Sequence, residues 1–216
     1  MPPASPSHAP TRPTLGGDIR DCLSNTDLDS LLGPFLGKRY VDALVLYRFR
    51  TGVTSLTHTK SLLRAALDAS DDREDHRWVF APLHVRHHWC VAFFWRTRVT
   101  RPEGDSFVTQ MRVFDSAPSA ITGKDIAKIA CRLEVPVVIS SPLRQNPRTN
   151  ECGLFVVLFA LIAESNLGGL FGHSGPTSFV CLAPWREFFA KNGFQLDSTV
   201  AREAMLLVTV PTCFWS

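Results

Sequence analysis

A cysteine that stands directly before an uninterrupted apolar run is the feature that most limits how this chain can fold. Cys152 is followed by Gly-Leu-Phe-Val-Val-Leu-Phe-Ala over residues 153–160, and the polar loop of residues 145–151 precedes it. This order predicts a buried helix that begins near the cysteine. Unpaired backbone N–H groups and the positive end of the helix dipole stabilise a thiolate at such a position, and a nearby cation adds to the effect. Cys152 is therefore the candidate nucleophile.

Two strand-like segments with a turn-rich stretch between them predict a β-hairpin upstream of that helix. The segments cover residues 89–95 and 107–114, and residues 101–105, Arg-Pro-Glu-Gly-Asp, have the composition of a hairpin loop. Strands joined in this way pair so that the residue numbers of facing positions have a constant sum. We place Trp95 opposite Val108, which fixes the predicted register of the whole hairpin.

The same register brings a histidine and an aspartate together at the open end of the hairpin. It puts Trp89 opposite Phe114 and His88 opposite Asp115, and facing side chains have Cβ atoms about 4.5–5.5 Å apart. A carboxylate that holds an imidazole fixes its tautomer and stabilises its protonated form, as the second and third members of a catalytic triad require. We therefore predict that Cys152, His88 and Asp115 form the catalytic set.

Gln145, seven residues before the cysteine, is the candidate oxyanion donor. A side-chain amide in the loop that approaches the nucleophile can donate a hydrogen bond to the oxygen that becomes negative during acyl transfer. The backbone N–H of Cys152 can supply a second donor. We therefore add Gln145 to the catalytic residues.

These four residues and their neighbours occur in an order that resembles a known family. The matching segments are, in chain order, His88-Trp89, Phe114-Asp115-Ser116, Gln145-Asn146 and Glu151-Cys152-Gly153. This order resembles the ubiquitin-like protease family, the cysteine peptidases that process and remove SUMO and related modifiers. Residues 80–82 resemble the family's strand before its histidine, and residues 35–42 resemble its Trp-Leu-Asn-Asp start of an early helix. The resemblance covers roughly residues 20–165.

The resemblance implies a fold and a reaction. The implied fold is α+β, of the papain-like or adenain-like cysteine protease type, with a central mixed sheet flanked by helices and the nucleophile at a helix N-terminus. The implied reaction is cleavage after the C-terminal glycine of a ubiquitin-like modifier, SUMO or a related one, through a thioester. The implied partner is therefore a ubiquitin-like modifier protein or its conjugates.

The resemblance also implies how the substrate is selected. In the family, two aromatic rings clamp a diglycine tail so closely that a side chain at either position is excluded, because only glycine lacks a Cβ. Trp89 and Phe35 would be these rings here. Phe35 stands where the family has a tryptophan, Gly37 and Lys38 replace its Asn-Asp pair, and Glu151 stands where aspartate is common. These departures bear on substrate identity more than on catalysis.

Length and composition predict one domain after a tail. Residues 1–17 are rich in Pro, Ser and Gly and indicate a flexible tail, and residues 18–216, in a chain that is 45% hydrophobic, can bury one sizeable core. The net charge of +3 is modest and the arginines are scattered among acidic residues, so nucleic-acid binding is not indicated. We expect a monomer.

The cysteines and the apolar segments predict the compartment. The run of residues 154–163 is too short to span a bilayer, and residues 1–8 lack the apolar core of a signal peptide. We therefore expect an intracellular protein, in the cytoplasm, the nucleus or both, with no membrane partner. The six cysteines have no paired spacing and are expected as reduced thiols, with Cys90 and Cys131 in the core.

Hydrophobic spacing and turn residues predict the other elements. We expect a capped short helix at residues 26–29, helices at 40–47, 61–67 and 124–133, a strand at 78–83 and a short buried strand at 135–140. Residues 168–176 are expected to form a loop, and residues 200–207 a terminal helix or strand. No family motif occurs after about residue 165.

Residues 84–90, His-Val-Arg-His-His-Trp-Cys, could instead belong to a zinc site, because imidazoles and a thiol at short spacing bind zinc. Period-two alternation puts His88 and Cys90 on one strand face, whereas His84 and His87 are expected as exposed residues of the preceding loop. No second ligand pair follows in the sequence. We therefore expect neither a metal nor an organic cofactor.

Two other functions are compatible with these residues. An acyl (acetyl) transferase on the same fold would pass the thioester to a lysine or a hydroxyl group, and basic pockets for a phosphorylated cofactor would favour it; the sequence shows no clear one. A module that binds a modifier without cleaving it would be marked by a substituted triad. Here all three triad residues are present.

Overall fold

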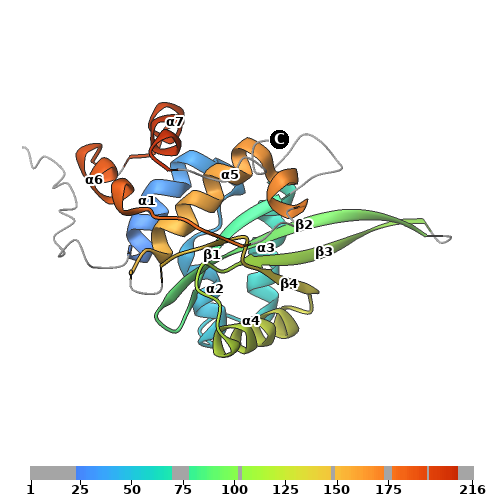
Figure 1. Ribbon diagram of the computed structural model, residues 1–216. Helices are drawn as coiled ribbons and strands as arrows, with labels where there is room; N and C mark the ends of the chain where they lie inside the picture. The colour runs from blue at the N-terminus through green and yellow to red at the C-terminus, as the bar shows by residue number, and fades with distance from the viewer. Residues whose placement is uncertain are drawn as a thin grey trace, which may run out of the picture.

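The computed structural model describes residues 23–69, 78–101, 104–146, 149–172, 177–193 and 195–208. A four-stranded mixed sheet forms its centre, with the strands in the order β1-β2-β3-β4 (Figure 1). Strands β1 (Trp78–Val85), β2 (His88–Arg101) and β3 (Gly104–Phe114) are antiparallel neighbours, and β4 (Val137–Ser140) is parallel to β3. The predicted tail of residues 1–17 lies outside the described residues.

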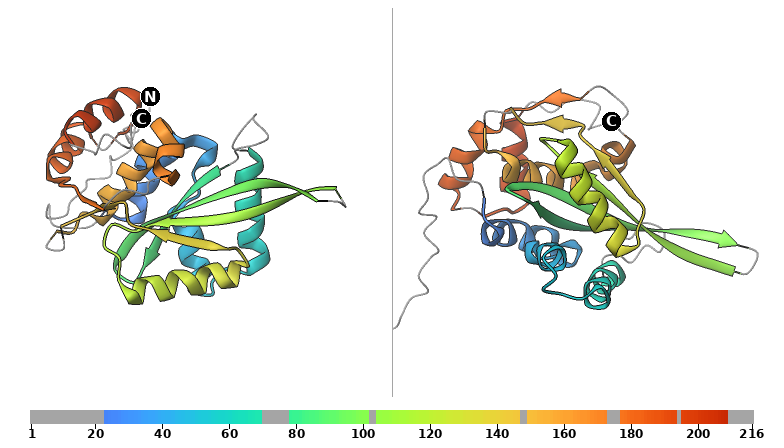
Figure 2. Two further views of the ribbon diagram at one scale, coloured as in Figure 1. Left: turned by 45° about the vertical axis from the view of Figure 1, so that its right-hand side comes forward. Right: turned by 90° about the horizontal axis from the view of Figure 1, so that it is seen from below.

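Helices cover both faces of this sheet (Figure 2). They are, in chain order, α1 (Asn25–Leu36), the 3-10 helix η1 (Gly37–Arg39), α2 (Ala43–Arg50), α3 (Leu56–Ala69), α4 (Ala120–Leu133), α5 (Cys152–Gly172), α6 (Ala183–Lys191) and α7 (Ser198–Leu206). Apolar residues of α2, α3 and α4 pack on one face, and those of α1, α5, α6 and α7 form the core with the other. The predicted α+β class is therefore confirmed.

Strand β2 shows why the sheet needs two covering layers. Val91 and Phe93 point to the core that contains α5, whereas Cys90, Ala92 and Phe94 point to the core that contains α2, α3 and α4. All five side chains are at most 1% exposed. Because successive residues of a strand face opposite sides, a continuous apolar run of this kind is stable only between two apolar layers.

Helix α5 accounts for the long apolar run. It begins at Cys152, and residues 151–163 are all buried, as expected of a helix that is apolar on every side. Residues 168–172, predicted as loop, belong to this helix. The ring of Phe171 packs against Phe93 and Trp95, and this contact holds the last turn in helical form despite the low helix propensity of glycine. No helix in the described ranges is long and apolar enough to cross a membrane.

Three smaller predictions also need correction. Strand β4 is a sheet edge and is not buried, since Val138 is 50% exposed and Ile139 is 39% exposed. Cys131 is exposed, because α4 turns other positions, including Ile126 and Ile129, toward the sheet. His84 lies in β1 and not in a loop.

The C-terminal part of the chain belongs to the same core. Strand β6 (Ser178–Phe179) pairs in parallel with β5 (Leu143–Arg144), just before Gln145. Trp185 of α6 is fully buried, and its indole N–H donates to the carbonyl oxygen of Ala204 in α7 at 2.7 Å. The segment after residue 165, which carries no family motif, thus supports the loop that leads to Cys152.

Candidate active site

The register of the β2–β3 hairpin differs from the predicted one by two residues. Trp95 pairs with Gln110 and not with Val108, and Val91 pairs with Phe114. The strands stay paired as far as Arg101 and Gly104, so the hairpin continues closer to its tip than the predicted loop of residues 101–105 allowed. A shift of two residues leaves every side chain on its predicted face, because the side-chain period of a strand is two.

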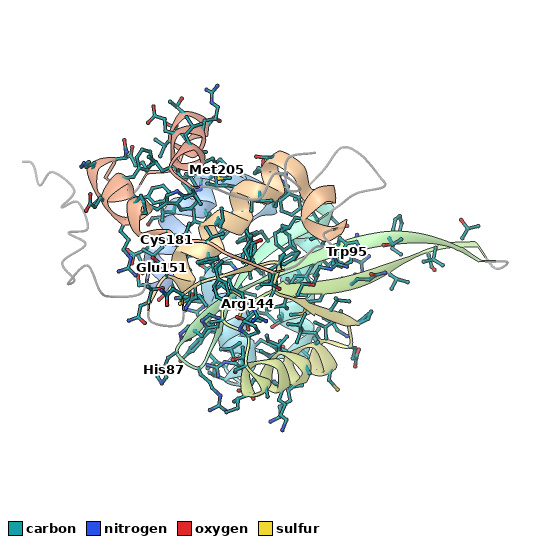
Figure 3. The ribbon with its side chains drawn as sticks, viewed as in Figure 1. His87, Trp95, Arg144, Glu151, Cys181 and Met205 are labelled. Carbon is teal, nitrogen blue, oxygen red and sulfur yellow. The ribbon has the colours of Figure 1, made fainter. Side chains whose placement is uncertain are left out.

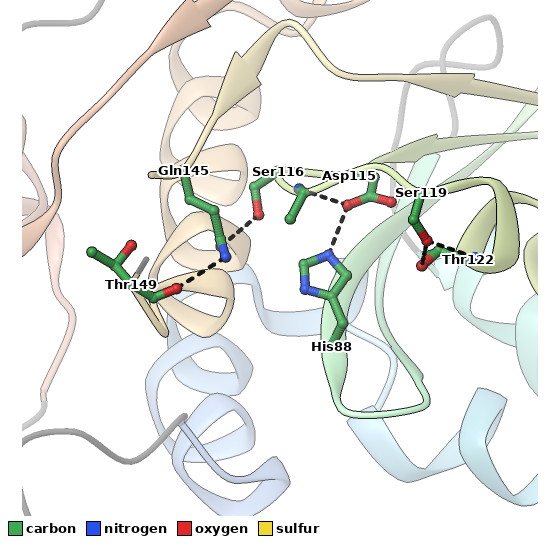
Figure 4. Close-up of polar contacts among 8 residues, drawn as sticks. His88, Asp115, Ser116, Ser119, Thr122, Gln145 and Thr149 are labelled. Atoms are coloured by element: carbon green, nitrogen blue, oxygen red, sulfur yellow. Dashed lines mark hydrogen bonds and ion pairs between the residues drawn. The ribbon is translucent and has the colours of Figure 1, made fainter. Parts of the chain in front are cut away.

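His88 and Asp115 nevertheless meet. Asp115 directly follows Phe114, the last residue of β3, and Phe114 pairs with Val91 of β2. Continuing the same register by one residue places Asp115 across from Cys90 and diagonal to His88. The Nε2 atom of His88 lies 2.7 Å from Oδ1 of Asp115 (Figure 4). The structure therefore brings the predicted base and its orienting carboxylate into a direct hydrogen bond.

The carboxylate of Asp115 is held from several sides. Its side chain is 1% exposed, and Oδ1 also accepts from the backbone N–H of Ala117 at 2.8 Å. The backbone N–H of Asp115 donates to the carbonyl oxygen of Ser140 at 3.0 Å, which ties this position to β4. A buried carboxylate with two donors is oriented for a single task, here toward His88.

The environment of His88 favours its protonated form. Burial disfavours the charge, but hydrogen bonds with Asp115, Cys152 and Cys90 outweigh burial and raise the pKa of His88 to about 12. These hydrogen bonds therefore favour the imidazolium form beside Cys152. A neighbouring imidazolium stabilises a thiolate, and proton exchange between the two groups can activate the sulfur.

Cys152 is the first residue of α5, at the helix start predicted from the sequence. It is 3% exposed and takes part in a hydrogen bond with His88. The next residue, Gly153, has no space for a side chain, because a Cβ there would lie 2.7 Å from Cβ of Leu23. The chain ahead of α1 is therefore pressed against the start of the helix that carries the thiol.

Gln145 is fixed between the end of β3 and the loop before Cys152. Its Oε1 accepts from the Ser116 hydroxyl at 3.0 Å (Figure 4). Its backbone N–H donates to the Ser116 carbonyl oxygen at 3.0 Å. Its Nε2 donates to the carbonyl oxygen of Thr149 at 3.2 Å. The amide is thus oriented with its donor end toward the 145–151 loop, and it is only 8% exposed.

Trp89 and Phe35 are not brought together. The indole N–H of Trp89 donates to the carbonyl oxygen of Leu23 at 2.7 Å, next to the start of α1. Phe35 lies near the other end of this helix, about 15 Å along its axis from Asn25 at 1.5 Å per residue. The neighbour of Trp89 near the candidate site is Leu23, which no sequence signal singled out.

Two further contacts near Cys152 were missed from the sequence. Arg186 of α6 donates to the carbonyl oxygen of Asn150 at 2.8 Å. Glu151 is 2% exposed, and its Oε2 accepts from the Thr149 hydroxyl at 3.0 Å. These contacts hold the loop before Cys152. The first of them joins segments 36 residues apart, which no local pattern reveals.

The three histidines of residues 84–90, the stretch considered above as an alternative zinc site, are not gathered at one point. His87 is exposed at the tip of the β1–β2 turn, as predicted (Figure 3). His84 is half-buried, with its ring centroid 4.7 Å from that of Trp89, and burial together with the charge of Arg50 lowers the pKa of His84. A different group could hold a metal: the ligand atoms of His88, Cys90 and Asp115 all lie within 4.8 Å of one another.

Comparisons with known proteins give distant structural likenesses. A structure of Xanthomonas XopD, from work on the substrate specificity of ubiquitin-like protein proteases, shares 16% sequence identity, covers 85% of this chain and 99% of that chain, and has a TM-score of 0.41. A mutant of XopD with one cysteine replaced by alanine shares 17% identity, covers 86% of this chain and 98% of that chain, and has a TM-score of 0.44. No family model and no curated protein matches the chain.

Proposed function

We propose that this chain is a cysteine peptidase or isopeptidase that cleaves after the C-terminal glycine of a ubiquitin-like modifier. The observation that carries the reaction type is the His88–Asp115 hydrogen bond of 2.7 Å, together with the hydrogen bond between His88 and Cys152 at the start of α5. Nucleophile, base and orienting acid are linked in the order that covalent acyl transfer requires. The substrate class rests on the resemblance of the sequence to ubiquitin-like proteases.

The reaction proceeds in two halves. The sulfur of Cys152 attacks the carbonyl carbon of the terminal glycine, and the C–N bond of the peptide or isopeptide breaks as His88 gives a proton to the departing amine. A thioester to Cys152 remains. Water then attacks the thioester while His88 accepts its proton, and the thiol and a free carboxylate are restored.

Asp115 and Gln145 act on these steps without forming bonds to the substrate carbon. Asp115 keeps the His88 ring in place and stabilises its imidazolium form. The amide of Gln145 and the backbone N–H of Cys152 are the donors for the oxyanion that forms in each half-reaction. Trp89 is the proposed wall against the glycine tail, and Phe35 is left out of this role because of its position on α1.

The proposal is tested with a panel of ubiquitin-like proteins that carry C-terminal electrophiles. The expected result is a covalent adduct with at least one member, seen by intact-mass spectrometry, which is lost in Cys152→Ala. Cys181→Ala is the matched control, because Cys181 is an exposed free thiol and its loss should leave the adduct unchanged. An adduct that persists in Cys152→Ala would overturn the assignment of the nucleophile.

A second readout separates hydrolysis from acyl transfer. The wild-type chain is incubated with a cleavable modifier conjugate, with and without added amine acceptors, and the products are weighed. A free C-terminal carboxylate is expected in both cases. A product found only as an amide of the added amine would show that the chain is an acyltransferase and not a peptidase.

A further inference from the structure

The hairpin register creates a cluster of three metal-binding groups. His88 and Cys90 are two positions apart on β2 and share a face, and Asp115 lies across from Cys90 at the end of β3. The ligand atoms of these three residues all lie within 4.8 Å of one another. The predicted register placed Asp115 opposite His88, whereas the observed register sets it across from Cys90 on the same face.

The donor set is one that zinc prefers. Imidazole nitrogen, thiolate sulfur and carboxylate oxygen bind Zn²⁺ at about 2.0–2.3 Å, and three protein ligands leave a fourth position for water. Tetrahedral bonds of that length put ligand atoms roughly 3.4–3.7 Å apart. The observed span includes this value, since His88 and Asp115 are 2.7 Å apart and the cluster extends to no more than 4.8 Å. Small side-chain rotations therefore suffice to admit an ion.

Access to the cluster is from the side of His88. Cys90 and Asp115 are each 1% exposed, whereas the His88 side chain is 17% exposed. An ion that enters there meets the imidazole first and then reaches the two buried groups. The buried carboxylate and thiol give it ligands that are shielded from water.

We propose that His88, Cys90 and Asp115 bind one thiophilic divalent cation of the Zn²⁺ class, and that the bound ion holds the active site inactive. Binding replaces the His88–Asp115 hydrogen bond by bonds from both residues to the metal. The proton of the Cys90 thiol and the proton on the coordinating nitrogen of His88 pass to solvent. The inhibitory half of this inference rests on the proposed function, whereas the binding half does not.

The site is distinct from a metal held by the nucleophile. Zinc can also bind a cysteine and a histidine of a thiol protease directly, and that mode would need Cys152. The cluster proposed here needs Cys90 and does not need Cys152. The two cysteine variants therefore give opposite results for the two modes.

Calorimetric titration of Zn²⁺ into the full chain tests the binding half without any substrate. One ion per chain is expected in the wild type, in Cys152→Ala and in Cys131→Ala. Cys131→Ala is the control, because it removes an exposed thiol outside the cluster. Binding in Cys90→Ser is expected to weaken by roughly 10–100-fold or more. Unchanged affinity in Cys90→Ser, or affinity lost in Cys152→Ala, would overturn the site.

Two measurements keep the test decisive if Cys90→Ser folds poorly. Asp115→Asn removes a second ligand and is expected to weaken binding in the same range. Co²⁺ in Cys152→Ala reports sulfur coordination by its thiolate charge-transfer absorption, which should be present. Full affinity in Asp115→Asn, or a cobalt spectrum without sulfur, would contradict the proposed ligand set.

The inhibitory half is measured with the modifier substrate. For each variant the activity is expressed as a fraction of that variant's own metal-free rate. The zinc concentration that halves this fraction is expected to be at least about 10-fold higher in Cys90→Ser than in the wild type. Calorimetry tests the metal site and the activity assay tests the proposed function, so the two hypotheses can fail independently. A chain that binds zinc but cleaves no modifier contradicts the proposed function and leaves the metal site intact. A chain that cleaves its substrate equally well with zinc bound contradicts the inhibitory role alone.

Discussion

The two ends of the β2–β3 hairpin have the same backbone pairing and very different surroundings. The inner end, residues 88–95 with 110–115, is flanked by β1 and β4 and packed on both faces. At the outer end the pairing of β2 with β1 stops at Trp95 and that of β3 with β4 starts at Met111, so residues 96–101 and 104–109 continue as a two-stranded arm (Figure 1).

This difference explains where the candidate catalytic groups lie. At the inner end a register slip would turn buried residues such as Phe93 and Phe94 to the wrong faces, so packing fixes the position of every side chain. At the outer end Phe107 is 55% exposed, and packing imposes little. His88 and Asp115 both occur at the inner end, where the sheet can hold them to the tolerance that catalysis needs.

The largest expected effect distinguishes Asp115, which directly follows β3, from Asp105, which lies in the outer arm. Asp115→Asn should lower kcat by about 10⁴-fold, because an amide does not stabilise the imidazolium and can favour the wrong tautomer of His88. Asp105→Asn, in the outer arm, should leave kcat unchanged. Steady-state kinetics on a modifier substrate measure both, with circular dichroism as the fold control. An unfolded Asp115→Asn would give this residue a structural role instead.

A similar contrast is expected for two phenylalanines. Phe93 contacts Trp78, Phe80, Phe114 and Phe171, so Phe93→Ala should lower the free energy of unfolding by about 3–5 kcal/mol. Phe107→Ala should change it by less than about 0.5 kcal/mol. Urea denaturation monitored by tryptophan fluorescence compares the two. Equal losses would show that the arm is packed as tightly as the inner sheet.

Two glutamines give a third contrast. Gln145→Ala should lower kcat by about 10²–10³-fold through loss of an oxyanion donor, with a smaller change in KM. Gln110, which pairs with Trp95 where the arm begins, is the matched control, and Gln110→Ala should keep the wild-type rate. An effect of Gln145→Ala on KM alone would assign this residue to substrate binding.

The smallest effect concerns pH. Because the pKa of His88 is raised from 6.5 to about 12 on folding, the folded chain holds more protons than the unfolded chain between these values. The stabilisation from His88 is full below about pH 6.5 and is lost as the pH rises toward 12. The free energy of unfolding should therefore fall between pH 7 and 9, by up to about 1.4 kcal/mol per pH unit from this residue.

Denaturation at several pH values in two variants isolates this contribution. Asp115→Asn removes the acceptor of the His88 hydrogen bond and should flatten the slope. His87→Gln removes an exposed histidine at the adjacent turn and should leave the slope of unfolding free energy against pH unchanged. Identical slopes in the two variants would mean that the His88–Asp115 pair is not the source.

Some of this architecture was predictable because it depends on local patterns. The polar loop followed by the apolar run after Cys152 favours a buried helix, and α5 begins at that residue. The His88–Asp115 contact was predicted from a register that is wrong by two residues, and it survives because a shift of two preserves the face. Period-two alternation is thus a stronger signal than the turn sequence from which the register was counted.

Other features were not predictable because they join distant segments. The contact of Leu23 with Trp89, the pairing of β6 with β5, and the bond from Arg186 to Asn150 depend on how the finished layers stack. Phe35 was chosen from its neighbours in sequence, and the length of α1 separates it from Trp89. Single-sequence reasoning identifies elements and faces, whereas tertiary packing decides which residues line the site.

The close approach of Leu23 to Gly153 makes position 153 intolerant of any larger residue. A Cβ there would lie 2.7 Å from Cβ of Leu23, and the carbonyl oxygen of Leu23 accepts the indole N–H of Trp89. Even Gly153→Ala would therefore push Leu23 away, and it would disturb the first turn of α5 and the Trp89 indole together.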